Sequence, residues 1–197
     1  MGVIQPVIAR MNRDTCATIT WPGLTMRSGT CTCPGSSSTL NWLTGAHGLT
    51  ASNVNTVMYL TPTGGTAGLY QMTAYLSATT ATFTLTTGNA AAVTAAACSM
   101  GDVGGAYSQP DAVLDRILQV HGTFGAGGTL SMYGSNDNIN YAVLKDNTGT
   151  ALTVTNLTVR NVFDGPLFDA PMITAGDATT SLSAILALRI QLPRGFT

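Results

Sequence analysis

Apolar and polar residues alternate along most of the chain in short segments that are separated by polar turns. Residues 81–86 show this most clearly, because Ala81, Phe83 and Leu85 alternate with threonines. A period of two places apolar side chains on one face of a strand and polar side chains on the other. Patterns of this kind, together with short apolar runs, predict strands at 27–33, 57–60, 69–76, 81–86, 114–124, 129–133, 141–144, 151–159, 167–173 and 181–192.

The turns between these segments favour an all-β fold. Residues 61–65, 125–128, 134–138 and 146–149 are rich in Gly, Asn, Asp and Thr, which suit tight turns. Strands at roughly 8–12-residue spacing with such turns are typical of β-sandwiches and β-barrels. The nearly continuous apolar run 182–190 predicts a last strand that is covered on both faces.

Composition supports this fold class and bears on partners. Charged residues make up only 9% of the 197 residues, against roughly 25% in typical proteins. The chain has no glutamate and a single lysine, Lys145, so substantial helix is not expected. A net charge of −1 offers no basic stripe for phosphates, which argues against direct nucleic-acid binding. With so few charged residues, copies of the chain repel one another only weakly, which is typical of a subunit of a large assembly.

Targeting signals and cysteines indicate a cytosolic product. No apolar run approaches the roughly 20 residues of a membrane-spanning helix, and the first residues lack a secretory-signal pattern. We therefore expect synthesis in the host cytoplasm and no membrane partner. The four cysteines are expected to be free and mostly buried thiols: Cys16, Cys31, Cys33 and Cys98.

Candidates for catalysis or metal binding are few. His47 lies in a turn-like segment with no nearby acid, and His121 lies in a predicted strand. Neither is spaced from the cysteines as a zinc site requires. Asp137 and Asp146 are expected to stabilise turns, since a calcium site there would need six to eight oxygen ligands. We predict a protein that is not an enzyme and that holds no metal and no cofactor.

Aromatic residues leave a carbohydrate-binding alternative open. Tyrosine and tryptophan can stack on sugars, but they also fill the cores of sandwiches and the interfaces between subunits. We favour the core and interface roles. The residues concerned are Trp21, Trp42, Tyr59, Tyr70, Tyr75, Tyr133 and Tyr141.

Four separated segments of the C-terminal half carry a resemblance. In chain order they are Gly-Thr-Phe-Gly-Ala-Gly-Gly at 122–128, Gly-Ser-Asn-Asp at 134–137, Asn140-Tyr141, and Thr-Ala-Gly-Asp-Ala-Thr-Thr-Ser-Leu at 174–182. Over residues 113–190 the chain resembles a β-sandwich module of tailed-bacteriophage structural proteins. The resemblance implies that the glycine-rich turns join neighbouring strands of a sandwich.

Charge is distributed unevenly, and this indicates the domain organisation. No Asp, Glu, Lys or Arg lies between Arg27 and Asp102, which predicts a distinct module at 26–100. Modules of the phage type carry a Trp-x-Gly-Leu-like segment that is soon followed by Gly-Asp. The resemblance therefore implies two β-sandwich, jelly-roll-like modules, with residues 26–100 inserted into a loop of a module formed by 1–25 and 101–197. Simple tandem domains are the alternative.

The same resemblance implies a structural virion protein, and within that class a capsid decoration (cement) protein on the capsid surface. Its partners would be the major capsid protein and further copies of itself, as a homotrimer by analogy. The alternatives are a tail, neck or fibre component, and a host-glycan-binding adhesin.

The two ends of the chain are the expected contact segments. Residues 2–13 read as an apolar arm that can add a strand to a neighbouring sheet, and residues 193–197 offer an aromatic anchor. The candidate interface residues are Val3, Ile4, Val7, Ile8, Arg10, Arg13, Arg194 and Phe196.

Overall fold

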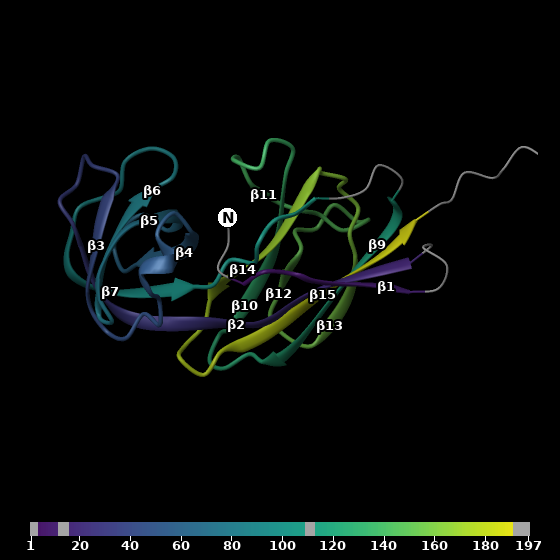
Figure 1. Ribbon diagram of the computed structural model, residues 1–197, viewed down its shortest axis with the longest axis horizontal. Coiled ribbons are helices and arrows are strands. Elements are labelled where there is room, and N and C mark those ends of the chain that lie inside the picture. Colours follow the sequence, from purple (N-terminus) through teal and green to yellow (C-terminus); the bar gives the residue numbers. More distant parts are fainter. Residues whose placement is uncertain (1–3, 12–15, 109–112, 191–197) are drawn as a thin grey trace, which may run out of the picture.

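A computed structural model describes residues 4–11, 16–108 and 113–190 of the chain. These residues form fifteen strands and one short 3-10 helix, η1 (Ala51–Asn53) (Figure 1). The prediction of an all-β chain is confirmed. The strands are β1 (Val7–Met11), β2 (Cys16–Cys33), β3 (Thr39–Thr44), β4 (Val57–Pro62), β5 (Gly68–Ser77), β6 (Thr80–Leu85), β7 (Val93–Gly101), β8 (Tyr107–Ser108), β9 (Val113–Thr123), β10 (Thr129–Ser135), β11 (Ala142–Val143), β12 (Thr153–Val154), β13 (Thr158–Asn161), β14 (Phe168–Ala175) and β15 (Ser181–Ile190).

Strand β2 is 18 residues long and belongs to two regions of the molecule. Its first part pairs with β1 and β15, and its second part pairs with β3 and β7. The sequence predicted a strand only over residues 27–33, where the alternation is clear. In the structure Pro22 and Gly23 form a bulge: the register against β15 shifts there, and Gly23 adopts a φ of +64°. A bulge tolerates proline and bends the strand without ending it.

The second part of β2 closes a six-stranded barrel in the order β2-β3-β6-β5-β4-β7, which lies at the left of Figure 1. The barrel closes because β7 pairs with β2 as well as with β4. Its interior holds large side chains that include Trp42, Tyr70, Phe83 and Met100. The sequence predicted a sandwich for this segment; the structure has a barrel instead, because the two outermost strands pair with each other.

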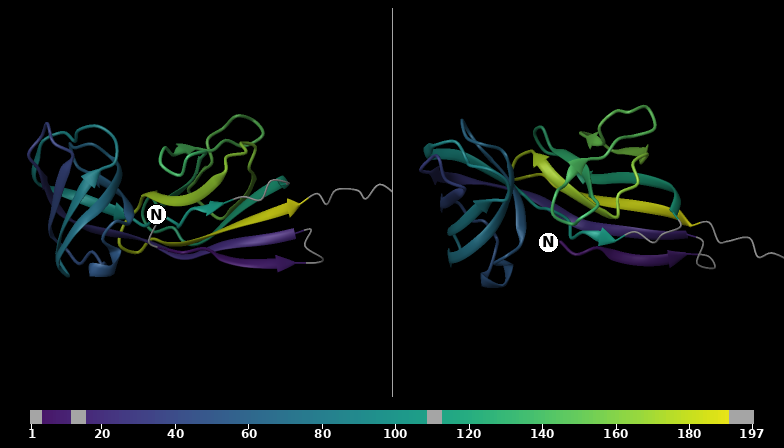
Figure 2. Two further views of the ribbon diagram at one scale, coloured as in Figure 1. Left: turned by 45° about the horizontal axis from the view of Figure 1, so that its top comes forward. Right: turned by 90° about the horizontal axis from the view of Figure 1, so that it is seen from above.

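The remaining strands form two sheets that share one core, here called the body (Figure 2). The back sheet has the order β13-β9-β15-β2-β1, and the front sheet has the order β11-β10-β14-β8, with β12 also on β10. Trp21, Leu118 and Leu186 of the back sheet belong to the same buried cluster as Leu130 and Ile173 of the front sheet. The jelly-roll topology expected for this region is not confirmed by this strand order.

Strand β15 was expected to be covered on both faces, and this prediction is wrong. Leu182, Leu186 and Leu188 are buried toward the front sheet, whereas Ile185 and Ala187 on the opposite face are only partly buried. The apolar run is therefore a strand with one core face and one apolar face that no other part of the described chain covers.

Asp102 ties the barrel to the body. Its carboxylate accepts hydrogen bonds from the Thr25 N–H at 2.9 Å and the Thr25 hydroxyl at 2.8 Å, and it pairs with Arg27. Next to it, a Cβ on Gly101 would lie 1.9 Å from the carbonyl oxygen of Ile173. The two regions meet in contact too close for any side chain at residue 101, and we call this the junction. Residues 16–25 pair with the C-terminal strand β15 within the body, while the domain boundaries themselves stay a prediction.

Candidate functional site

The predicted N-terminal arm is placed in part by the structure. Ile4 is half-buried against the body core and bridges to Gly104, so it is anchored to its own chain. Val7 is 60% exposed and Ile8 is 53% exposed, both in β1. The backbone of Arg10 lies in the same strand. The remaining predicted contact residues, Val3, Arg13, Arg194 and Phe196, lie outside the described residues.

Strand β1 is an edge of the back sheet. It pairs with β2 alone among the described strands, with Val7 opposite Thr20 and Ile8 opposite Ile19. Successive side chains point to opposite faces of a strand, so the exposure of both Val7 and Ile8 means that neither face of β1 is covered. An uncovered apolar edge strand presents backbone groups with which another strand can pair.

The outer face of the back sheet continues this surface with two uncharged rows of side chains, and the exposed Arg189–Asp115 pair lies beyond them on the same face. One row of cross-strand neighbours runs across all five strands, and a second row runs beside it. Both rows mix apolar with small polar side chains, as is common at protein interfaces. The first row is Val159, Gln119, Ile185, Thr20 and Val7, and the second is Asn161, Ile117, Ala187, Thr18 and Ala9.

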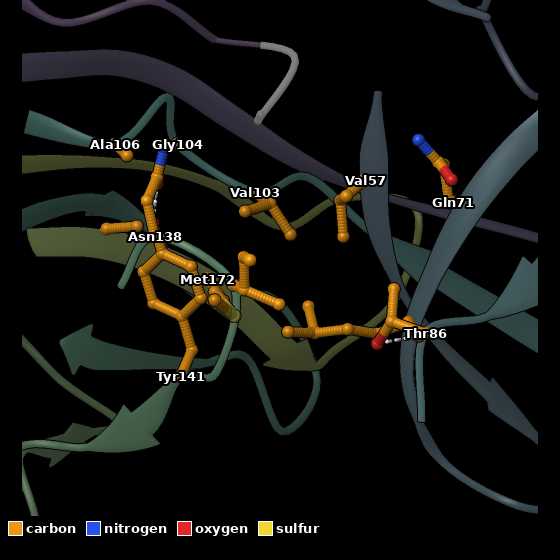
Figure 3. Close-up of a pocket in the computed structure, with 12 residues that line it drawn as sticks. Val57, Gln71, Thr86, Val103, Gly104, Ala106, Asn138, Tyr141 and Met172 are labelled. Atoms are coloured by element: carbon orange, nitrogen blue, oxygen red, sulfur yellow. Dashed lines mark hydrogen bonds between the residues drawn. The ribbon is translucent and has the colours of Figure 1, made fainter. Parts of the chain in front are cut away.

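A second candidate site is a cleft between the barrel and the front sheet (Figure 3). Two adjoining cavities, of about 290 and 400 Å³, share Leu69, Thr86, Ile139 and Tyr141 in their walls. In Figure 3, Val57, Gln71 and Thr86 project from the barrel side, while Tyr141 lies on the opposite side close to Met172. Neither cavity is lined by a described Asp, Glu, Lys, Arg or His.

The aromatic residues divide between the cores and this cleft. Trp21, Trp42 and Tyr70 are buried in the body or the barrel, as a core role predicts. Tyr59, Tyr133 and Tyr141 instead line the second cavity and are only partly buried. Sequence reasoning counted all of these tyrosines as candidates, but it had no signal that would place three of them together.

Two of these tyrosines keep their hydroxyl groups available. Within the described residues, neither Tyr59 Oη nor Tyr133 Oη forms a hydrogen bond, whereas Tyr141 Oη donates to Asn138 Oδ1. Burial and the neighbouring Tyr59 raise the pKa of Tyr133 to about 12. Burial and the charges of Asp137 and Asp169 raise the pKa of Tyr141 as well. The phenols of Tyr133 and Tyr141 therefore remain protonated at neutral pH and can donate hydrogen bonds.

The histidines do not form a catalytic arrangement with an acid in the described residues. His47 is fully buried in the barrel, where its Nε2 lies 2.8 Å from the Ser77 carbonyl oxygen and its Nδ1 accepts from the Leu49 N–H at 3.1 Å. Both ring nitrogens therefore contact backbone groups, one at the end of β5 and one in the loop before η1. His121 is partly buried in β9, opposite Ser183 of β15.

The predicted turn roles of aspartate are confirmed. Asp137 accepts hydrogen bonds from the N–H groups of Ile139 and Asn140 at 2.9 and 2.8 Å. Asp146 accepts from the N–H groups of Thr148 and Thr150 at 2.9 and 3.0 Å. These bonds lower the pKa of Asp137, and together with the Thr148 hydroxyl they lower the pKa of Asp146 to about 2.

Cys31, Cys33 and Cys98 are free and buried in the barrel, as expected. Over the described parts of the chain, no three His, Cys, Asp or Glu side chains gather where they could hold a metal ion. Those parts also contain no helix of the length and hydrophobicity needed to cross a membrane. Comparison of the chain with protein-family models, curated proteins and solved structures gave no match.

Proposed function

We propose that this chain is a structural virion protein of a tailed bacteriophage and acts as a capsid decoration protein. It binds across joints between major capsid subunits, assembles as a homotrimer and performs no catalysis. The observation that carries the proposal is the edge strand β1, whose Val7 and Ile8 are exposed on opposite faces. The motifs shared with phage modules in residues 113–190 supply the virion context.

Binding through β1 follows from backbone chemistry. A strand of the capsid subunit pairs with the open edge of β1 and extends the back sheet by main-chain hydrogen bonds. The exposed apolar side chains add burial worth roughly 25 cal/mol for each Å² removed from water. The two uncharged rows on the outer face of the back sheet then adjoin the new strand through Val7 and Ala9, so few charges must be desolvated.

The test measures the attachment of two double variants to phage particles. Particles assembled without the protein are compared with particles that contain it. Val7→Lys with Ile8→Lys places charge on both faces of β1, where the exposed side chains leave room for it. We expect this variant to keep its circular dichroism spectrum and to lose attachment to particles. Leu76→Lys with Leu157→Lys changes residues that are 66% and 70% exposed elsewhere and serves as the matched control, with attachment retained. Full occupancy by the β1 variant would contradict the proposal.

Copy number separates decoration from the nearest alternative. Hundreds of copies in each particle, counted by quantitative mass spectrometry, are expected of a decoration protein. A handful of copies would instead assign the chain to the tail, neck or fibre. Light scattering of the purified chain tests the homotrimer independently.

A further inference from the structure

We propose that the cleft between the barrel and the front sheet binds a neutral carbohydrate of one or two sugar rings. The inference is separate from capsid attachment, because the cleft lies between β4, β5 and the loop that follows β10, and not at β1. The two cavities, of about 290 and 400 Å³, adjoin through shared walls and together have the size of a small-ligand site.

The chemistry of the walls selects the class of ligand. Asn138, Asn140, Gln71 and Thr86 bring amides and hydroxyls to the cleft, which can donate and accept hydrogen bonds. A phosphate, carboxylate or nucleotide would require a cation, and a basic ligand would require an acid. Neither kind of group lines the described walls. A ligand rich in hydroxyl groups and without charge matches this inventory.

The tyrosines supply the remaining contacts of a sugar site. Tyr59 of β4 and Tyr133 of β10 approach from opposite regions, and their hydroxyls have no partner in the described chain. A half-buried hydroxyl without a hydrogen-bond partner is stabilised most by a ligand that supplies a polar partner in the cleft. The ring of Tyr141 lies beside Met172, which forms an apolar surface for the C–H face of a sugar (Figure 3).

The two walls are held at a fixed distance before any ligand arrives. Asp102 joins Thr25 and Arg27 at the junction, and Gly101 lies against the backbone of Ile173. The hydrogen bond from Tyr141 to Asn138 likewise fixes the ring on the loop side. A site that is already ordered loses less conformational entropy on binding, which favours measurable affinity even for a small ligand.

The test is titration of the full chain, labelled with ¹³C at the methionine methyl groups, with cellobiose, maltose, chitobiose and lactose up to millimolar concentrations. We expect at least one sugar to shift the Met172 methyl signal saturably. Tyr133→Phe removes only a hydroxyl, and it should weaken that sugar about five- to tenfold. Tyr75→Phe makes the same change outside the cleft and should leave the affinity unchanged.

Two results overturn the inference. One is the absence of a Met172 shift with every sugar of the panel, and the other is equal affinity of the Tyr133→Phe variant and the parent chain. Retained circular dichroism spectra show that the variants are folded.

Discussion

The barrel and the body differ in how they treat the edges of their sheets. The barrel closes on itself, so its six strands leave no open edge, and residues 28–101 contain no Asp, Glu, Lys or Arg. The body keeps open edges such as β1, and its described residues contain the pairs Arg116–Asp169, Arg160–Asp146 and Arg189–Asp115. Closure satisfies backbone groups without the help of charges, whereas an open sheet retains edges for partners.

Their turns differ in the same way. In the barrel, the hydroxyl of Ser77 accepts from the N–H groups of Thr79 and Thr80. In the body, the carboxylates of Asp137, Asp146 and Asp177 fill this role. The charged side chains of the described residues stabilise turns and the junction and form both buried and exposed ion pairs. The barrel should be insensitive to ion-pair mutations and to protonation of carboxylates, and the body should respond to both.

The largest effect is expected from Arg116→Leu. Its guanidinium donates to both carboxylate oxygens of Asp169, at 3.2 and 3.3 Å, and both side chains are buried. Loss of one partner from a buried pair lowers the free energy of unfolding by about 3–5 kcal/mol. Hydrogen exchange should show faster exchange in β9 and β14 and unchanged exchange in β6. Arg189→Leu, in a pair that is 73% and 63% exposed, is the control and should cost less than about 1 kcal/mol.

Gly101→Ala should disturb both regions, because it acts at the junction between them. The added Cβ would meet the Ile173 carbonyl oxygen at 1.9 Å, so the backbone must move. We expect a loss of about 3 kcal/mol, at the upper end for overpacking, measured by urea denaturation. Gly165→Ala adds the same methyl group with no atom within 4 Å and should leave the stability unchanged. Equal denaturation curves for the two variants would contradict the tight junction.

His47→Ala tests the barrel alone. The substitution leaves the Leu49 N–H without its acceptor and removes the edge-on contact with Tyr75, whose ring centroid lies 5.9 Å away. Loss of buried hydrogen bonds of this kind costs about 1–3 kcal/mol. Hydrogen exchange should become faster in β5 and β6 and remain unchanged in β9. Faster exchange in the body as well would mean that the two regions unfold as one unit.

Acidification is expected to have the smallest of these effects, and it should lower the stability of the body more than that of the barrel. Hydrogen bonds lower the pKa values of Asp137, Asp146 and Asp177 in the folded state, that of Asp146 to about 2. Depressed pKa values mean that the stabilisation is complete above the unfolded value near 3.8 and is lost as the pH falls toward 2. The body should lose stability between pH 4 and pH 2 while the barrel does not, as followed by hydrogen exchange at several pH values. Asp177→Asn should reduce this pH dependence.

Local patterns predicted many of the strands, but residues 151–159, predicted as one strand, form parts of two short ones, β12 and β13. Local patterns also failed where the outcome depends on distant segments. Val57–Pro62 and Thr80–Leu85 alternate in burial as their sequences do, because side-chain alternation is a property of the strand itself. Strand β3 was missed, although Leu40 and Trp42 alternate with Thr39 and Asn41, because this alternation is short and ends at Trp42. Closure of the barrel depends on β7 meeting β2, a pairing between distant residues that no local pattern records.

The two candidate sites also differ in whether local sequence patterns could predict them. The sequence predicted Val7 and Ile8 as contact residues because an apolar arm is visible locally, and the structure places both at the surface. The cleft could not be predicted, since Tyr59 and Tyr133 are far apart in sequence and meet only because the junction fixes the barrel beside the front sheet. Each tyrosine considered alone is compatible with a core role.

The continuous strand β2 has a mechanical consequence. Its 18 residues, at about 3.3 Å each, make a covalent rod of roughly 60 Å that runs from the back sheet into the barrel. A tensile load applied between the ends of this rod is carried by its covalent backbone, which is already extended, and does not have to pass through the hydrogen bonds between strands. Stretching by single-molecule force spectroscopy between residues 16 and 33 should therefore meet high resistance.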